Sequence, residues 1–498
     1  MNSIANLFGW RRPLSGSLEF TDDLVYPVHL HDANFAKLLM ACTMRFDGVL
    51  DAEKLHSALS RLLEIGDWKK VGGRLRRNPF KVDGRLEIHT PIEYSAERPA
   101  VTYSRADLSL IRIGDHDLGC KLPRPTPHTS IHPTPYQQID LAIREDMPRT
   151  IDEMVDRDIP QISLHVVSFQ DATLVSIAWP HSVMGSAGFG HLVRAWSLVV
   201  SGNESEVPPF LGARTDVLLE AEDGEGAASR EELLVAKDRL SGLSLLAFLL
   251  RLIWGMRKTR EVKSVMIPKQ AVQKLLGACQ QEIFDTTAPQ ASAAPPVDGT
   301  TILAWFARLA TSGSSDNKPI TVVSMSNAAY SIPSLVSNYG VNIHNMTTYA
   351  FSFLPGAIAR GRLGPLVKEH THQMQQQQAE KQCLSFLRMV RRTTEHSGSF
   401  KPLYGPSDAH TVVCCDMTAA DPLRSADFGA AVVEKSEGAS SGAPGTMTCL
   451  YYHMIKGQLG AGLDCIYLLG KDGRENLWVA AALPAETWQR VEAALKDY

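Results

Sequence analysis

Two strand-like runs followed by an amphipathic helix constrain the fold more than any other part of the chain. Residues 162–169 (ISLHVVSF) and 172–180 (ATLVSIAWP) are rich in β-branched side chains and only two residues separate them, so we expect a hairpin. After Pro180 apolar residues recur at helical spacing, Ser186 is the expected N-cap, and Gly202 marks the stop. This unit predicts a mixed α/β (α+β) fold in which paired strands pack against a helix.

The rest of the chain repeats this mixture of strand and helix patterns. Its 498 residues are enough for more than one hydrophobic core. An acidic, small-residue stretch near residue 220 and a new strand pattern near residue 265 separate two halves of similar size. We therefore expect a first domain over 1–220, a crossover linker with an apolar helix over 221–265, and a second domain over 266–498.

Charge and cysteine content exclude several classes of protein. The 50 Lys and Arg residues nearly balance 54 Asp and Glu, giving a net charge of −4, whereas nucleic-acid binders usually carry a basic excess. The eight cysteines show no repeated CxxC spacing, which argues against a disulfide scaffold or a zinc cluster. The N-terminal residues lack the apolar core of a signal peptide, so a cytoplasmic protein is expected.

The longest apolar run, Leu243 to Met256, leaves two interpretations open. It has 14 residues and contains Arg251, whereas a membrane span needs about 20 apolar residues. It is therefore either a helix packed on the body of the protein or an interfacial helix in weak contact with a membrane surface. Arg257 and Lys258, which follow the run, are compatible with the second interpretation.

Several motif matches carry no function. GASSG at 438–442 fits the serine-hydrolase pattern, but another strand-like run follows it where the elbow needs a helix. The pairs His29/His31 and His370/His372 lack further ligands in a tetrahedral pattern, Asp32 alone being a weak third ligand. The sequence therefore predicts no metal site and no bound cofactor.

His181 is the best candidate for chemistry because of where it lies. It follows the second strand of the hairpin and precedes the helix, so the backbone fixes its position while the side chain can face a cleft. A neutral imidazole there can accept a proton from a hydroxyl or amine nucleophile. The N-terminus of the following helix favours the neutral form.

The stretch around His181 resembles the His-x-x-x-Asp-Gly region of the BAHD acyl-CoA-dependent acyltransferases of plants and fungi. It resembles chloramphenicol acetyltransferase and peptide-synthetase condensation domains more distantly. Further matches follow in the family's order: LHDAN at 30–34, GRLRR at 73–77, VPPF at 207–210, VDGT at 297–300, NYGVN at 338–342 and DFGAA at 427–431. Each motif is weak alone, but their order covers most of the chain.

The sequence departs from the family at the motif itself. Gly185 stands where the family has its Asp, and Ser186 where it has the following Gly, while Ser182 lies in the same loop. In the family that Asp points away from the substrate and braces the loop through an arginine, so its loss removes a brace and keeps the base. A buried arginine left unpaired there would cost about 3–5 kcal/mol.

The resemblance also assigns a structural role to the second motif. Asp427, Phe428 and Gly429 correspond to residues that lie far from the reaction centre in the family. The motif's Trp-Gly is replaced by Ala430 and Ala431. We therefore expect these residues to support the fold and not the chemistry.

The resemblance implies two chloramphenicol-acetyltransferase-like domains with a channel at their interface. The implied activity is acyl transfer from acyl-CoA, as co-substrate, to a hydroxyl or amine of a secondary metabolite, with His181 as general base in a monomer. Two alternatives remain open, and the replacement of the Asp by Gly185 favours the first of them. The fold could be repurposed for a cyclisation or isomerisation of a polyketide- or terpenoid-like intermediate without CoA, or it could only bind a ligand.

Overall fold

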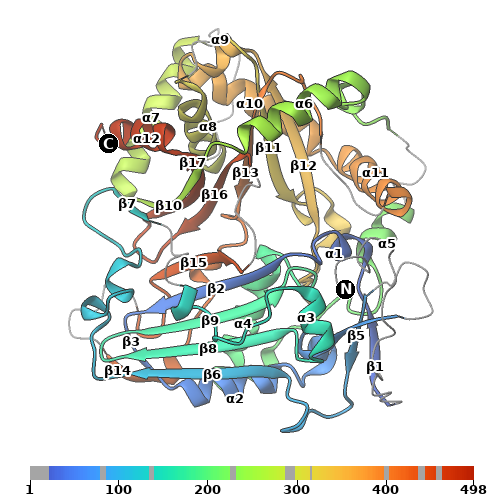
Figure 1. The fold of residues 1–498 in the computed structure, drawn as a ribbon, viewed down its shortest axis with the longest axis vertical. Helices are drawn as coiled ribbons and strands as arrows, with labels where there is room; N and C mark the ends of the chain where they lie inside the picture. Colours follow the sequence, from blue (N-terminus) through green and yellow to red (C-terminus); the bar gives the residue numbers. More distant parts are fainter. Residues whose placement is uncertain are drawn as a thin grey trace, which may run out of the picture.

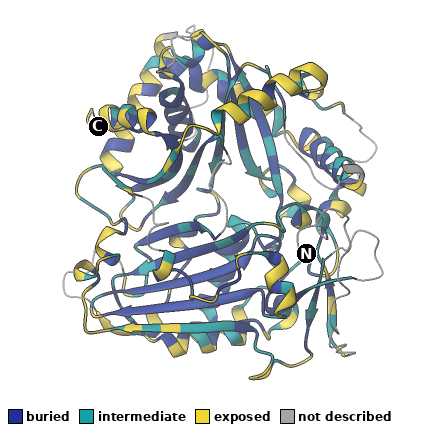
Figure 2. Cartoon of the chain, viewed as in Figure 1, coloured by how far each residue is buried: buried dark blue, intermediate teal, exposed yellow. Residues whose placement is uncertain are grey.

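The structure is a computed structural model that describes residues 22–78, 86–133, 139–224, 231–286, 298–313, 317–397, 403–435, 443–455 and 462–497. Figure 1 shows an upper and a lower layer of strands, each flanked by helices. Figure 2 shows that the strands of both layers are largely buried, while exposed residues lie mainly on the outer helices and loops. The mixed α/β class expected from the sequence is confirmed.

The lower layer is a five-stranded sheet in the order β15-β2-β9-β8-β6. Its strands are β2 (Leu39–Phe46), β6 (Val101–Leu108), β8 (Ile162–Phe169), β9 (Thr173–Pro180) and β15 (Cys449–Met454). Helices α2 (Ala52–Leu62) and α4 (Ser186–Val200) pack against each other, and Trp196 of α4 donates from Nε1 to the carbonyl of Leu55 on α2. Burial of both strands of the β8–β9 hairpin along their whole length explains their continuous apolar and β-branched sequence.

The upper layer is a seven-stranded sheet in the order β12-β11-β13-β16-β17-β10-β7. Its strands are β7 (Ser130–Pro133), β10 (Arg260–Ile267), β11 (Ile320–Asn327), β12 (Thr347–Leu354), β13 (His410–Asp416), β16 (Asp464–Lys471) and β17 (Leu477–Pro484). Helices α8 (Asp298–Thr311), α10 (Leu363–Gln377) and α12 (Ala485–Leu495) contact this sheet. Its apolar core is separate from that of the lower layer.

Smaller elements complete the description. The short strands are β1 (Leu24–Pro27), β3 (Gly48–Leu50), β4 (Arg74–Arg77), β5 (Leu86–Thr90) and β14 (Val432–Lys435). The remaining helices are α1 (Leu30–Asn34), α3 (Ile151–Asp156), α5 (Val217–Asp223), α6 (Gly242–Gly255), α7 (Lys269–Thr286), α9 (Gly356–Ala359) and α11 (Glu380–Ser397). Of the motif matches, GASSG at 438–442 lies outside the described residues.

The two sheets exchange strands, so the expected sequence boundaries do not separate them. β15 comes from the region expected to form the second domain, yet it pairs with β2 in the lower sheet. β7 comes from the expected first domain and pairs with β10 in the upper sheet. A division at 220 and 266 therefore describes the two cores only approximately, because strand pairing over long sequence distances crosses it in both directions.

The hairpin and helix expected around His181 are confirmed. β8 and β9 pair antiparallel from Ser163–Ala178 to Ser168–Thr173. The two-residue turn lacks glycine, but Asp171 stabilises it by accepting a hydrogen bond from the backbone N–H of Ile113 at 2.9 Å. The N-cap of α4 is Gly185, one residue before the predicted Ser186.

The DFGAA segment packs on the lower sheet rather than on the upper one. The ring of Phe428 is fully buried, with its centroid 5.3 Å from that of Phe46 and 4.6 Å from that of Trp196. The backbone N–H of Asp427 donates to Ser197 Oγ, and Asp427 Oδ1 accepts from the N–H of Gly429. These residues connect the late part of the chain to the core beneath α4, away from the residues that line the central cavity described below.

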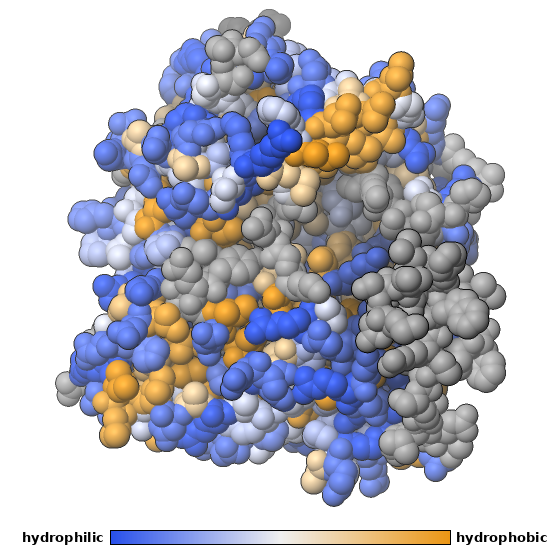
Figure 3. All heavy atoms as spheres, viewed as in Figure 1, coloured by the Kyte–Doolittle hydropathy of each residue, from blue (hydrophilic) through white to orange (hydrophobic). Residues whose placement is uncertain are grey.

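The apolar run expected to form a helix is α6, which packs on the body through one face only. Phe248 is its sole buried residue, and Arg251 donates to the carbonyl oxygens of Ser407 and Ala409. Figure 3 shows the other apolar side chains as a continuous orange band along α6 at the upper right. Within the described residues, every helix is too short or too polar to cross a bilayer.

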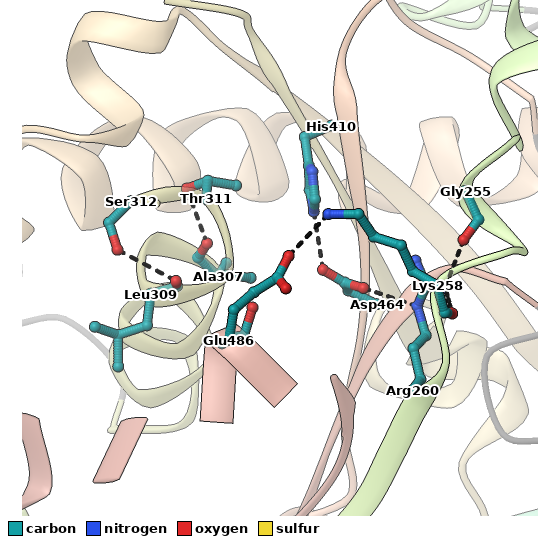
Figure 4. A network of polar contacts seen from close by, with 12 residues as sticks. Gly255, Lys258, Arg260, Ala307, Leu309, Thr311, Ser312, His410, Asp464 and Glu486 are labelled. Carbon is teal, nitrogen blue, oxygen red and sulfur yellow. Dashed lines mark hydrogen bonds and ion pairs between the residues drawn. The ribbon is translucent and has the colours of Figure 1, made fainter. Parts of the chain in front are cut away.

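A polar network fixes the end of α6 against the upper sheet (Figure 4). Arg260, at the start of β10, donates to Asp464 at 2.9 Å and to the carbonyl of Gly255 at 3.2 Å. The second carboxylate oxygen of Asp464 contacts His410 Nε2 at 2.9 Å. This network anchors the C-terminal end of the helix, in addition to the contacts of Phe248 and Arg251, while the apolar band faces outward.

Candidate active site

His181 lies at the junction of β9 and α4, beside a cavity of about 410 Å³. Its backbone N–H donates to the carbonyl of Leu38 at 2.8 Å, which fixes the first residue after the strand. The ring stacks on Phe35, with centroids 4.9 Å apart. The structure confirms that His181 lies in the loop between a strand and a helix, as predicted, and it shows that the ring lines the cavity.

Both sheets contribute to the cavity. The lower layer and its loops supply Leu38, Met40, Trp179, His181, Gly185, Ser186, Leu450 and Met454, among others, and the upper layer supplies Val262, Ser264, Met325, Val413, Cys465 and Ala480, among others. Most of the described residues that line the cavity are apolar, and among them are no Lys or Arg and a single carboxylate, Asp416. The cavity therefore suits an uncharged, largely apolar ligand.

Burial determines the protonation state of His181. Desolvation lowers the pKa of the imidazole below its ordinary value of 6.5, whereas its own backbone carbonyl, Asn345 and Asp32 act in the opposite direction. Because the net shift is downward, the ring is neutral at pH 7 and can accept a proton. This is the state that a general base requires.

The other predicted loop residues have different surroundings. Ser182 is buried and is not among the residues that line the cavity, whereas Gly185 and Ser186 line it. Gly185 has an extended backbone (φ −88°, ψ −174°), so the backbone itself does not require glycine there. A Cβ built at Gly185 would lie 3.2 Å from Oδ1 of Asn345, and this amide fills the space beside the loop.

Asn345 is a site residue that the sequence did not reveal. Its Nδ2 donates to the backbone carbonyl of His181 at 2.7 Å and to Oδ1 of Asp32 at 2.8 Å. It lies three residues after the NYGVN match, which is the nearest sequence motif that could have pointed to this part of the site. Among the described residues that line the cavity beside Gly185 there is no arginine, so the unpaired arginine considered from the sequence is not found in this lining.

Asp32, from the LHDAN match, is the buried carboxylate of the site. Oδ1 accepts from the backbone N–H of Asn345 at 2.9 Å, and Oδ2 contacts Nδ1 of His344 at 2.7 Å. Burial acts to raise the pKa of Asp32, but His344, Lys70 and the Asn345 N–H outweigh it and lower the pKa to about 2. The side chain is ionised at neutral pH and is part of a polar cluster with His344 and Asn345.

The comparisons extend over nearly the whole chain, although no protein-family model matches it. Acetyltransferase BOT5 of Botryotinia fuckeliana is 30% identical over 511 residues, covering 96% of this chain and 91% of that protein. O-acetyltransferase PaAT-2 of Phomopsis amygdali is 29% identical over 489 residues, covering 95% and 98%. The solved structure of F. graminearum TRI101 complexed with coenzyme A and T-2 mycotoxin has a TM-score of 0.63 at 14% identity, covering 96% and 98%.

Proposed function

From the premise that this chain belongs to the BAHD-type family of acyltransferases, we propose that it transfers an acyl group from acyl-CoA to a hydroxyl or amine of an apolar secondary metabolite. His181 is the general base. The observation that carries the proposal is the partly buried, neutral imidazole of His181 in a cavity formed by both sheets.

The reaction follows from the position of His181. The imidazole takes the proton of the acceptor hydroxyl or amine as the acceptor attacks the carbonyl carbon of the thioester. A tetrahedral intermediate forms, the carbon–sulfur bond breaks, and the proton returns from the imidazolium to the leaving thiolate. The products are the acylated acceptor and free CoA.

The lining of the cavity restricts the acceptor. Among the described residues that line the cavity, Asp416 is the sole carboxylate and none is a Lys or Arg, so the lining offers no guanidinium or ammonium partner for an anionic group on the acceptor. The same argument places the phosphates of CoA outside this apolar region. We therefore expect lipophilic, uncharged alcohols or amines to be acylated in preference to carboxylate-bearing analogues.

Calorimetric titration with CoA and acetyl-CoA, followed by a thiol-release assay, tests this function. We expect micromolar binding and CoA release that depends on a lipophilic acceptor. A carboxylate-bearing analogue of the same acceptor serves as the matched control and should react poorly. Absence of binding to both ligands would contradict acyl transfer and favour the CoA-independent cyclisation or isomerisation.

The exposed band on α6 supports a separate proposal about where the enzyme works: α6 lies on a lipid surface. The band comprises Leu243, Leu246, Leu249, Leu250, Ile253, Trp254 and Met256. Arg257 stacks on Trp254 at 4.4 Å, which places an aromatic ring and a cation at one end, as interfacial helices do. With a rise of about 1.5 Å per residue and a width of about 10 Å, α6 presents an apolar face of about 200 Å². A stable dimer buries roughly 800 Å² of surface on each partner, so this face is too small to be a dimer interface.

Vesicle flotation tests the α6 proposal. We expect the protein to float with phosphatidylcholine–phosphatidylserine vesicles, and Ile253→Glu, which puts a charge in the middle of the band, to abolish flotation. Leu110→Glu is the matched control because Leu110 is an exposed leucine far from α6 in the sequence and outside the band. The proposal fails if the native protein stays unbound, if Ile253→Glu floats equally, or if sedimentation shows a dimer that this variant dissociates.

A further inference from the structure

The carboxylate missing from the His181 loop has a counterpart on another element. Gly185 has no side chain to brace the loop, and Asn345 occupies the adjacent space, with its Oδ1 3.2 Å from the place of a Cβ on Gly185. Asn345 is hydrogen-bonded in turn to a carboxylate, that of Asp32 on α1. Asp32 thus contacts Asn345 and not the loop itself. Asn345 therefore connects the carboxylate to the loop.

We propose that Asp32 and Asn345 are positioning residues that hold His181 for proton transfer, in place of a carboxylate within the loop. The proposal rests on the proposed function, in which His181 is the base. Asn345 uses the two hydrogens of one amide nitrogen, donating one to the carbonyl of His181 at 2.7 Å and the other to Asp32 at 2.8 Å. Any rotation of the amide breaks both bonds.

Asp32 fixes the orientation of this amide. Its Oδ1 accepts from both the backbone and the side-chain nitrogen of Asn345, so the residue is held at two points. An amide turned by half a rotation would direct Oδ1 of Asn345 at an ionised carboxylate, which is repulsive in a buried site. The carboxylate of Asp32 thereby selects the rotamer in which Nδ2 reaches the carbonyl of His181.

The surroundings keep Asp32 ionised. The titratable groups whose charges act on Asp32, or on which its charge acts, are His29, His31, Lys70, His181 and His344. His344 also contacts the carbonyl of Gly212 through Nε2 at 2.9 Å. The second oxygen of the carboxylate thus has its own partner in His344, and the charge of Lys70 also favours the ionised form, so Asp32 does not need a guanidinium partner.

A close backbone approach brings the segment with Asn345 to the loop. The carbonyl oxygen of Ile343 lies so near the first turn of α4 that a Cβ on Gly188 would be 2.2 Å from it. The backbone N–H of Gly185 also points to this carbonyl, at 3.4 Å. The segment 343–345 therefore packs directly on the turn that carries His181, and the hydrogen bond of Asn345 crosses this contact.

Asn345→Ala tests the proposal with a matched control, Asn476→Ala. Asn476 is likewise buried and donates from its backbone nitrogen and its Nδ2 to one carboxylate, that of Asp472, both at 3.0 Å. It lies outside the cavity lining. We expect both variants to lose similar thermal stability, and only Asn345→Ala to lose about 10²-fold in kcat, with KM for acyl-CoA little changed.

Asn345→Asp adds a second measurement, the dependence of the rate on pH, which would not change if Asn345 had only a structural role. The new carboxyl cannot donate while it is ionised and it faces Asp32, so the variant should be nearly inactive at neutral pH. Protonation as the pH falls restores a donor, so the rate relative to the native protein should rise toward acid pH. Asn476→Asp should show no such rise.

A readout independent of turnover separates this proposal from the proposed function. In NMR spectra of protein labelled at its 16 histidines, the His181 signal is identified by its loss in His181→Ala. We expect Asn345→Ala, or Asp32→Asn if that variant does not fold, to shift or broaden this signal, and Asn476→Ala to leave it unchanged. A shift without acyl transfer in the native protein would overturn the function and support the positioning role.

The positioning role is overturned by the opposite pattern. In that pattern, Asn345→Ala leaves the NMR signal of His181 unchanged, and the kcat of Asn345→Ala is no lower than the kcat of Asn476→Ala. An Asn345→Asp variant whose relative rate does not change with pH would also contradict the role, because the donor would then be dispensable.

Discussion

His181→Ala is expected to lower the acyl-transfer rate by about 10²–10⁴-fold while leaving acyl-CoA binding nearly intact. General-base assistance is worth this much when the proton acceptor is well placed, and truncation removes only the imidazole and its stacking on Phe35. Steady-state kinetics with thiol release and calorimetric binding measure the two quantities separately. A variant that retains nearly the native rate would exclude His181 as the base.

His370→Ala is the control for the loss of a buried imidazole. His370 is fully buried on α10, contacts Ser352 Oγ at 2.8 Å through Nδ1, and lies outside the cavity lining. Burial lowers its pKa to about 4, so it resembles His181 in being neutral at pH 7. We expect its truncation to reduce stability without the loss of kcat.

The same base gives the expected pH dependence. Burial lowers the pKa of His181 below 6.5, and the neutral form is the active one, so the rate falls only when the pH drops through this lowered pKa. The rate should therefore be flat through pH 7, with its acid limb below pH 6.5. An acid limb centred above pH 7 would contradict a buried base.

Gly185→Asp is expected to reduce acyl transfer by about 10–10²-fold, although it restores the carboxylate that the family resemblance leads one to expect. The added Cβ would lie 3.2 Å from Oδ1 of Asn345, so a carboxylate would face an acceptor. To escape this repulsion Asn345 must turn its amide away, which breaks its bonds to Asp32 and to the carbonyl of His181.

The effect of Gly185→Asp on stability sets two terms against each other. Gly185 is the N-cap of α4 without a side-chain cap, and aspartate there improves on glycine by only a few tenths of a kcal/mol. Loss of buried hydrogen bonds costs about 1–3 kcal/mol, so we expect a net loss in chemical denaturation. Gly185→Ala is the matched control: it adds the Cβ without the charge and should be milder. A rise in transfer with Gly185→Asp would mean that the native site is a weakened acyltransferase.

The sequence located His181 but not the residues that contact its loop. His181 was predictable because the change from strand to helix pattern around Pro180 is local, and both patterns are readable within about 40 residues. Asp32 had been considered only as a weak metal ligand, and Asn345 was not considered. These two residues are 313 positions apart in the sequence. Their contact depends on how α1 packs against the segment after β11, which no local sequence pattern encodes.

The organisation of the sheets shows the same limit. The strand patterns at 432–435 and 449–454 were visible in the sequence, and the structure places strands there. Their partners were not visible: β14 pairs with β3, and β15 with β2, both from the first fifth of the chain. Consequently the expected boundary between the halves separated residues that share one sheet.

The sequence by itself determined the mixed α/β class, the β8–β9–α4 unit and the position of His181, because side-chain periodicity and turn residues act between near neighbours in the chain. The tertiary structure alone decided which strands share a sheet, which residues line the cavity, and that Asp32 reaches the His181 loop through Asn345. These depend on the packing of distant segments, such as the close approach of Ile343 to Gly188, which no local pattern encodes.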